Sequence, residues 1–225
     1  MALTDTLVIR GTEKEEERLE GRTGWQGKQI FDKVFAVFFI ILTLPLFLLI
    51  AALVKLTSRG PVFYKQERLG YRGKPFRILK FRTMVVDAER VLEDYLRRNP
   101  QLREEYEKYF KLKKDPRITP LGRILRKTSL DELPQLFNIL LGNMSVVGPR
   151  PIIQEEVVKY GENAGKLFSV KPGLTGLWQV SGRADLTYDE RVKLDMEYIE
   201  RQNFFLDLFI ILKTVPVIFK GHGAY

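Results

Sequence analysis

The longest run of hydrophobic positions lies near the N-terminus, from Val34 to Val54. These 21 residues carry no charge, and Thr43 is their only clearly polar member. As a helix the run would be roughly 30 Å long, which matches the hydrocarbon core of a bilayer. Helices of soluble proteins usually keep a polar face over such a length. The pattern therefore favours a membrane helix over a buried core helix.

Two features bear on whether this helix crosses the membrane or turns back. Pro45 lies near its middle, where proline removes a hydrogen-bond donor and clashes with the preceding turn. Positive residues favour the cytoplasmic side of a membrane, and they flank both ends of the run. A re-entrant hairpin would place both ends on one side, but spanning helices also tolerate proline, so both topologies stay open. The flanking residues are Arg22, Lys28 and Lys33 before the run and Lys55, Arg59, Lys65 and Arg68 after it.

The following segments predict a mixed helical and strand region. Val62–Tyr64 and Phe76–Phe81 are strand-like, and Gly70 and Gly73 between them favour a hairpin. Asp87–Lys114 is rich in charge, has apolar residues at helical spacing, and is interrupted by a proline at position 100. Amphipathic helices of this kind either lie on a membrane surface or cover a protein core.

Two later segments match the capping box that begins many helices, Ser129–Glu132 and Thr187–Glu190. The first predicts a helix over Leu133–Leu141 that stops at Gly142, and the second predicts a helix to about Asn203. A loop rich in glycine and proline separates the two. The C-terminal stretch from 204 to 219 is apolar but contains two charges and a proline, which is typical of an interfacial segment.

Composition narrows the chemistry that the chain can perform. It contains no Cys and a single His, His222, which we interpret as a bystander. These counts exclude Ser-His-Asp and Cys-His centres and a zinc site of His and Cys ligands. Carboxylates, Lys, Arg and hydroxyls remain, and any metal would be a hard cation such as Mg²⁺. The net charge of +9 favours nucleic acid, anionic lipid or phosphate-bearing partners.

Asp131 and Glu132 are the candidate catalytic pair. A purely structural role is also open, because acids in a first helical turn are favoured by the helix dipole, and Asp189–Glu190 repeat the pattern. The first pair differs in its neighbours, since Arg126 precedes it and Arg150 follows between two prolines. Such a cluster suits a phosphate and its Mg²⁺. We expect the cations to keep Asp131 ionised, so that it can attack a phosphoryl group that carries a good leaving group.

Further candidates lie in two other segments. Lys80 and Arg82 could clamp a phosphate or could simply be outward charges at a strand edge. Trp178 and Gln179 lie in the glycine-rich loop, where the indole could anchor at a membrane interface, pack in the core or stack on a base.

Several stretches together resemble the bacterial sugar transferase family, the monotopic phosphoglycosyl transferases, over Lys28 to Tyr225. The motifs are long and occur in order along the chain. They are Lys80-Phe81-Arg82-Thr83-Met84, Asp115-Pro116-Arg117-Ile118-Thr119-Pro120-Leu121-Gly122, Ser129-Leu130-Asp131-Glu132-Leu133-Pro134-Gln135-Leu136, Met144-Ser145-Val146-Val147-Gly148-Pro149-Arg150-Pro151 and Pro172-Gly173-Leu174-Thr175-Gly176-Leu177-Trp178-Gln179-Val180-Ser181-Gly182-Arg183.

The resemblance implies transfer of a sugar 1-phosphate from a UDP-sugar to undecaprenyl phosphate, with release of UMP. It implies that Asp131 and Glu132 are the catalytic dyad, that Asp131 forms a covalent phospho-sugar intermediate, and that Mg²⁺ is required at the dyad. It implies a re-entrant helix broken at Pro45, although Leu44 stands where smaller members usually have Ser. The basic positions that match those around the phosphates are Lys80, Arg126 and Arg150.

The resemblance also predicts an organisation and a location. Residues 1–24 would be a polar tail, 25–58 the re-entrant membrane region, and 59–225 a cytosol-facing catalytic domain with interfacial helices. The expected fold is α+β and mostly helical, with a small β-hairpin, at the cytoplasmic face of the bacterial inner membrane. The loop with Trp178, Gln179 and Arg183, like the chain's last five residues, resembles members that use UDP-galactose or UDP-glucose. A homodimer is possible, and no nucleic-acid partner is expected.

Two other interpretations of the sequence remain. A membrane-anchored nucleic-acid-binding protein would fit the charge, but the basic residues are scattered among acids and no known binding motif occurs. A non-catalytic membrane scaffold for polysaccharide assembly would tolerate loss of the Asp131 charge.

Overall fold

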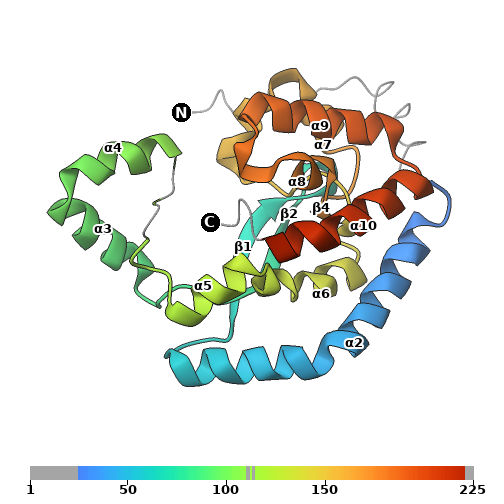
Figure 1. Ribbon diagram of the computed structural model, residues 1–225. Coiled ribbons are helices and arrows are strands. Elements are labelled where there is room, and N and C mark those ends of the chain that lie inside the picture. Colours follow the sequence, from blue (N-terminus) through green and yellow to red (C-terminus); the bar gives the residue numbers. More distant parts are fainter. Residues whose placement is uncertain (1–24, 110–111, 113–114, 221–225) are drawn as a thin grey trace. The chain divides into compact units, whose positions relative to one another are not determined.

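The computed structural model describes residues 25–109, 112 and 115–220, and it is mostly helical (Figure 1). The predicted tail at 1–24 and His222 lie outside these residues. In chain order the elements are α2 (Lys28–Thr57), β1 (Phe63–Leu69), η1 (Tyr71–Gly73), β2 (Pro75–Phe81), α3 (Ala88–Arg98), α4 (Pro100–Tyr109), α5 (Pro120–Lys127), η2 (Leu130–Glu132), α6 (Gln135–Leu140), β3 (Ser145–Val147), η3 (Gln154–Lys159), η4 (Gly161–Asn163), α7 (Ala164–Leu167), β4 (Gly173–Thr175), α8 (Leu177–Ser181), η5 (Arg183–Asp185), α9 (Tyr188–Arg201) and α10 (Phe204–Lys220).

Helix α2 is the long apolar helix that the sequence predicts. Its length and composition suffice to cross a membrane, and 11% of its most apolar 18-residue window is buried. A helix so apolar and so exposed indicates membrane association. The helix is continuous through Pro45, so the break that was expected at this residue is absent. Proline removes only one backbone donor, and a long apolar helix can continue past that loss.

The chain divides into two compact units, each described by itself. The first takes its described residues from Met1–Leu42, Lys65–Leu79 and Gln135–Gly223, and the second from Thr43–Tyr64 and Lys80–Pro134. The division inside α2 falls within one turn of Pro45. The predicted division into tail, membrane region and catalytic domain stays a prediction.

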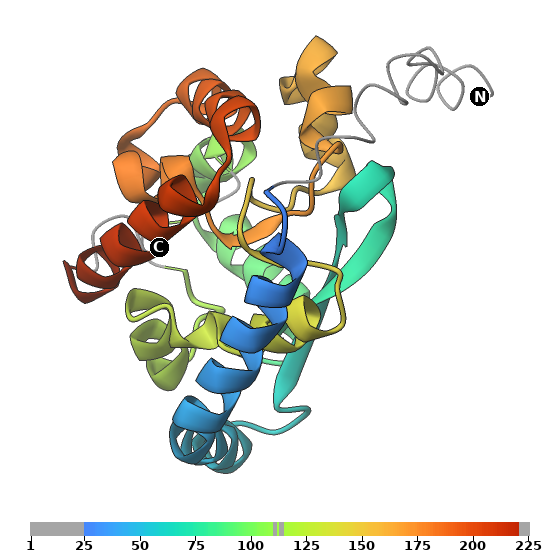
Figure 2. The same cartoon turned by 90° about the vertical axis from the view of Figure 1, so that its right-hand side faces the viewer.

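Short strands and packed helices build the first unit. Strands β3 and β4 pair in parallel, with Ser145 opposite Gly173 and Val147 opposite Thr175. The sequence predicted only a loop at β4, since a three-residue strand that begins with glycine carries no alternating pattern. Helix α8 contacts both α9 and α10 (Figures 1 and 2). Strands β1 and β2 form the predicted hairpin, and buried Asn138 of α6 bonds to the backbone of Arg77 and Leu79 in β2.

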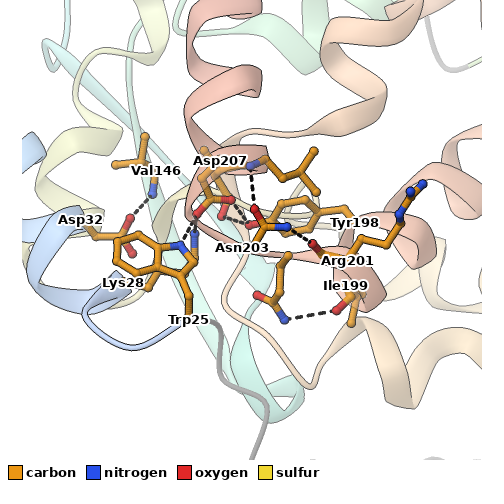
Figure 3. Close-up of polar contacts among 12 residues, drawn as sticks. Trp25, Lys28, Asp32, Val146, Tyr198, Ile199, Arg201, Asn203 and Asp207 are labelled. Carbon is orange, nitrogen blue, oxygen red and sulfur yellow. Dashed lines mark hydrogen bonds and ion pairs between the residues drawn. The ribbon is translucent and has the colours of Figure 1, made fainter.

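A buried polar network joins α2, α9 and α10 within the first unit (Figure 3). Asp207 of α10 has no exposed surface. Its carboxylate accepts hydrogen bonds from Trp25 Nε1 at 3.0 Å and from the Tyr198 hydroxyl at 2.8 Å, and it forms an ion pair with Lys28. One turn further along α2, Asp32 accepts a hydrogen bond from the Val146 amide at 3.0 Å. The predicted interfacial segment is therefore a helix that turns its one acid inward.

The second unit has its own hydrophobic core, built by the C-terminal half of α2, the end of β2 and α5. Its fully buried members are Ile50, Val54, Phe81 and Leu125. Helix α5 contacts η2, the short 3₁₀ helix that carries the candidate dyad. The charge-rich segment after β2 forms helices α3 and α4 as predicted, and α4 begins at its proline.

Candidate active site

The two segments that look alike in sequence fold differently. At Thr187 the capping box is present: its hydroxyl accepts from the Glu190 amide, and the Glu190 carboxylate accepts from the Thr187 amide, at the start of α9. At Ser129 the prediction is wrong, because this residue has a left-handed backbone (φ 56°) and its side chain caps nothing. The chain then forms a single 3₁₀ turn, and α6 starts only after Pro134. Asp131 and Glu132 are thus held by a strained turn, not by a helix start.

Asp131 is a buried carboxylate, with 8% of its surface exposed. Its pKa is raised from 3.8 to about 6, chiefly by burial and also by the neighbouring Glu132 charge, although Lys80 and Arg126 act in the opposite direction. The expectation that cations would dominate its ionisation is therefore corrected: desolvation outweighs their attraction. At neutral pH the carboxylate is still mostly ionised, but it is an unusually basic one.

Glu132 is occupied by a salt bridge. Lys80 Nζ, from the end of β2, lies 2.6 Å from Glu132 Oε1, and both side chains are mostly covered. A hydrogen-bonded pair in partly desolvated surroundings has a defined geometry. Lys80, predicted to bind phosphate, is therefore directly tied to the dyad.

Arg126 of α5 is the second cation of this group. Its Nε donates to the Thr83 hydroxyl at 2.9 Å, and its charge favours ionisation of Asp131. Burial lowers its pKa, although an arginine stays protonated at any physiological pH. Nearby, Asp115 accepts three hydrogen bonds from the Arg117 guanidinium, at 2.6–3.1 Å, which hold the pKa of Asp115 below its usual value.

Arg82 lies at the C-terminal end of α2. Its Nη2 donates to the Ser58 carbonyl at 2.9 Å and to the Ser58 hydroxyl at 2.7 Å. Gly60 allows this approach, because a Cβ there would lie 2.3 Å from Arg82 Nη1. In this structure Arg82 therefore braces the end of α2, and its predicted role in a phosphate clamp stays a prediction.

The other predicted site residues belong to the first unit. Arg150 follows β3, where the preceding Pro149 carbonyl accepts from the Gly173 amide at 2.8 Å. The Arg191 guanidinium lies over the Trp178 ring, 5.0 Å from its centroid. Gln179 Nε2 donates to the Leu174 carbonyl at 3.3 Å, and Arg183 has a left-handed backbone.

Sequence reasoning missed several polar residues, some in each of the two units. Thr83 was only part of a motif, although its hydroxyl binds Arg126. Asp195 of α9 is fully buried, accepts from the Tyr160 hydroxyl at 2.9 Å, and has its pKa raised to about 7 by burial. An aspartate on a helix that is mostly charged gives no sign of burial in a linear sequence.

The donor atoms at the dyad fit a hard divalent cation shared with a ligand. Asp131 and Glu132 supply adjacent carboxylates whose mutual repulsion raises the Asp131 pKa, and such repulsion is relieved by a cation. Within the described residues no group of three or more potential ligand residues occurs. Mg²⁺ commonly takes one or two carboxylates and completes its shell with water and substrate phosphates.

A family model, bacterial sugar transferase, matches residues 23–221. The chain belongs to the bacterial sugar transferase family. It is 48% identical over 202 residues to the exopolysaccharide production protein ExoY of Rhizobium meliloti, covering 90% of this chain and 89% of that protein. These matches make the protein a transferase.

Two longer relatives of this sugar transferase have names that state an activity. The undecaprenyl-phosphate galactose phosphotransferase of Salmonella typhimurium is 47% identical over 88% of this chain and 41% of its own length. The UDP-glucose:undecaprenyl-phosphate glucose-1-phosphate transferase of Klebsiella pneumoniae is 40% identical over 88% of this chain and 41% of its own length.

Proposed function

We propose that the protein transfers a hexose 1-phosphate from a UDP-sugar to undecaprenyl phosphate and releases UMP, with Asp131 as nucleophile. The observation that carries this proposal is the buried Asp131 carboxylate, whose pKa is raised to about 6 beside the Lys80–Glu132 pair and Arg126. A desolvated carboxylate is a stronger nucleophile than an exposed one, and the adjacent cations offset the charge of an incoming diphosphate.

The reaction proceeds in two displacements. An oxygen of Asp131 attacks the phosphorus that bears the sugar, a new Asp–O–P bond forms, and the bond to the UMP oxygen breaks. An oxygen of the lipid phosphate then attacks the same phosphorus, the Asp–O–P bond breaks, and the free carboxylate is regenerated. No proton transfer is needed in either step, since the attacking and departing oxygens are all anionic.

The basic residues and Glu132 have separate roles in this proposal. Arg126 neutralises charge on the transferred phosphoryl group. Lys80 holds Glu132 beside Asp131 and adds a second positive charge. Arg150 is proposed to bind phosphate, and Trp178, Gln179 and Arg183 to contact the nucleotide or sugar. Mg²⁺ held by Asp131 and Glu132 with diphosphate oxygens would supply further charge neutralisation for the departing UMP.

The donor sugar is proposed to be galactose or glucose. The activities named for the Salmonella and Klebsiella relatives support a hexose donor and the undecaprenyl phosphate acceptor. The Rhizobium relative supports a place in exopolysaccharide production. The product would be the lipid-diphosphate sugar on which further sugars are added.

We further propose that α2 enters and leaves the membrane on the cytoplasmic side as one continuous helix, which bends near Pro45 instead of breaking there. The positive residues at both ends of α2 support this topology. UDP-sugars are cytosolic, so a cytoplasmic active site would meet its donor and its lipid acceptor at one surface.

Intact-protein mass spectrometry tests the first displacement. The purified protein is incubated with Mg²⁺ and a panel of UDP-sugars in the absence of lipid. We expect a hexose-phosphate adduct that is lost in Asp131→Asn and retained in Asp189→Asn, its sequence-matched control. Turnover that survives in Asp131→Asn would refute the assigned nucleophile. An absence of both adduct and UMP release, even with lipid phosphate present, would favour the scaffold interpretation.

A further inference from the structure

Thr83 connects the end of the β-hairpin to the basic side of the candidate active site. It follows β2 directly, its side chain is buried, and its hydroxyl accepts the hydrogen bond from Arg126 Nε at 2.9 Å. All the contacts in this argument lie within the second compact unit. The proposed mechanism uses Arg126 but gives Thr83 no role.

The backbone of Thr83 is held from two directions. Its carbonyl accepts from the Thr119 amide at 3.0 Å and from the Thr119 hydroxyl at 3.3 Å. Gly122, in the first turn of α5, lies against the same carbonyl, since a Cβ there would lie 2.0 Å from the oxygen. A side chain with so firmly positioned a backbone can serve as a fixed point for another residue.

The hydrogen bond to Thr83 is made by Arg126 Nε, which is the one guanidinium nitrogen that does not lie at the end of the side chain. An arginine has five N–H donors in a rigid plane, and the two terminal nitrogens together match the oxygens of a phosphate. When Nε is held by Thr83, the plane of the guanidinium group is set, and with it the direction of the two terminal nitrogens. The charge of Arg126 also favours the ionised form of Asp131, so the two groups interact electrostatically.

We propose that Thr83 is a positioning residue, which orients the Arg126 guanidinium so that its terminal nitrogens meet the phosphoryl group attacked by Asp131. This inference rests on the proposed function and deepens it. Thr83 does not touch the substrate, so its effect passes through Arg126. An arginine that is misaligned at a transferring phosphoryl group loses transition-state stabilisation more than it loses substrate affinity.

The test measures single-turnover formation of the hexose-phosphate adduct across a set of variants. Thr83→Val and Thr83→Ala remove the hydroxyl, and Thr83→Ser keeps it. We expect the first two to slow adduct formation by about tenfold or more with a smaller change in KM for the UDP-sugar, and Thr83→Ser to restore most of the rate. Thr57→Val is the control, because the Thr57 hydroxyl only bonds to the Leu53 carbonyl of its own helix.

A double-mutant cycle separates positioning from a general effect on the fold. Lysine has no Nε, so in an Arg126→Lys background Thr83→Val should slow adduct formation no further. An additional loss in that background, or a wild-type rate in Thr83→Val, would overturn the inference. The Asp131→Asn variant in the same assay keeps the two proposals distinct. If Asp131→Asn still forms the adduct, the proposed function fails. If Asp131→Asn forms no adduct and Thr83→Val forms it at the normal rate, only the role of Thr83 fails.

Discussion

At the residue scale, the proposed chemistry of this protein depends on Asp131, whose ionised form is disfavoured by burial. Asp131 is covered by the structure, adjoins another carboxylate, and lies in a turn that begins with a left-handed serine. Such arrangements cost stability and occur at sites where reactivity is required. Two predictions follow from the direction of its pKa shift.

The first prediction concerns stability. The pKa of Asp131 is raised from 3.8 to about 6, so its ionised form destabilises the folded protein above pH 6, and this penalty disappears as pH falls below about 4. Asp131→Asn should therefore increase the free energy of unfolding by about 1–3 kcal/mol at pH 8 while abolishing activity. Denaturant unfolding in detergent at pH 8 and at pH 4 measures it, and an equal gain at both pH values would contradict this cause.

The second prediction concerns rate. Adduct formation from a UDP-sugar should increase with pH and reach half its maximum near pH 6, as Asp131 loses its proton. The lipid-free half-reaction is the right measurement, because the lipid phosphate itself titrates near this pH. A rate that is flat from pH 5 to pH 8 would contradict the elevated pKa.

At the scale of secondary-structure elements, the capping box at Thr187–Glu190 can be compared directly with the similar sequence at Ser129–Glu132, which forms no cap. Thr187→Ala should lower the free energy of unfolding by about 1 kcal/mol, because the hydroxyl caps α9. Ser129→Gly should leave stability unchanged or raise it, because glycine adopts a positive φ without strain. Thermal unfolding of both variants tests this, and a cap-like loss in Ser129→Gly would show that the serine side chain does hold the turn.

The hydrogen bonds and the ion pair around Asp207 hold α2 to α9 and α10. Asp207→Asn should destabilise the protein by about 3–5 kcal/mol, because the buried Lys28 loses its counter-charge. Glu197→Gln is the control, since its ion pair with Arg201 is exposed and worth well under about 1 kcal/mol. Chemical denaturation in one detergent compares the two, and equal effects would contradict the importance of burial.

At the scale of the whole molecule, the open question is how α2 lies in the membrane. The chain has no Cys, so single cysteines at Thr4 and Lys65 can be labelled without background. A membrane-impermeant thiol reagent applied to the periplasm should leave both unlabelled, because a re-entrant helix keeps its two ends on the cytoplasmic side. Periplasmic labelling of Thr4→Cys alone would establish a spanning helix instead.

The sequence by itself determined the features that depend on long or local patterns. A charge-free run of 21 residues predicts an apolar helix wherever it is placed, and Thr187–Glu190 makes its cap from atoms within one turn. The absence of Cys and the single His excluded whole classes of chemistry. The family motifs carried the rest of the functional prediction.

Only the tertiary structure decided which of the two similar segments caps a helix and which carries the candidate dyad. Ser129–Glu132 has the same local pattern as Thr187–Glu190, yet Lys80, 52 residues away along the chain, takes the glutamate that would have completed the cap. The residues on either side of the dyad, Leu130 and Leu133, also pack against a core that includes Ile50 and Phe81, which are distant in sequence. Desolvation and long-range ion pairing depend on which atoms surround a charge in space, so the local sequence alone does not specify them.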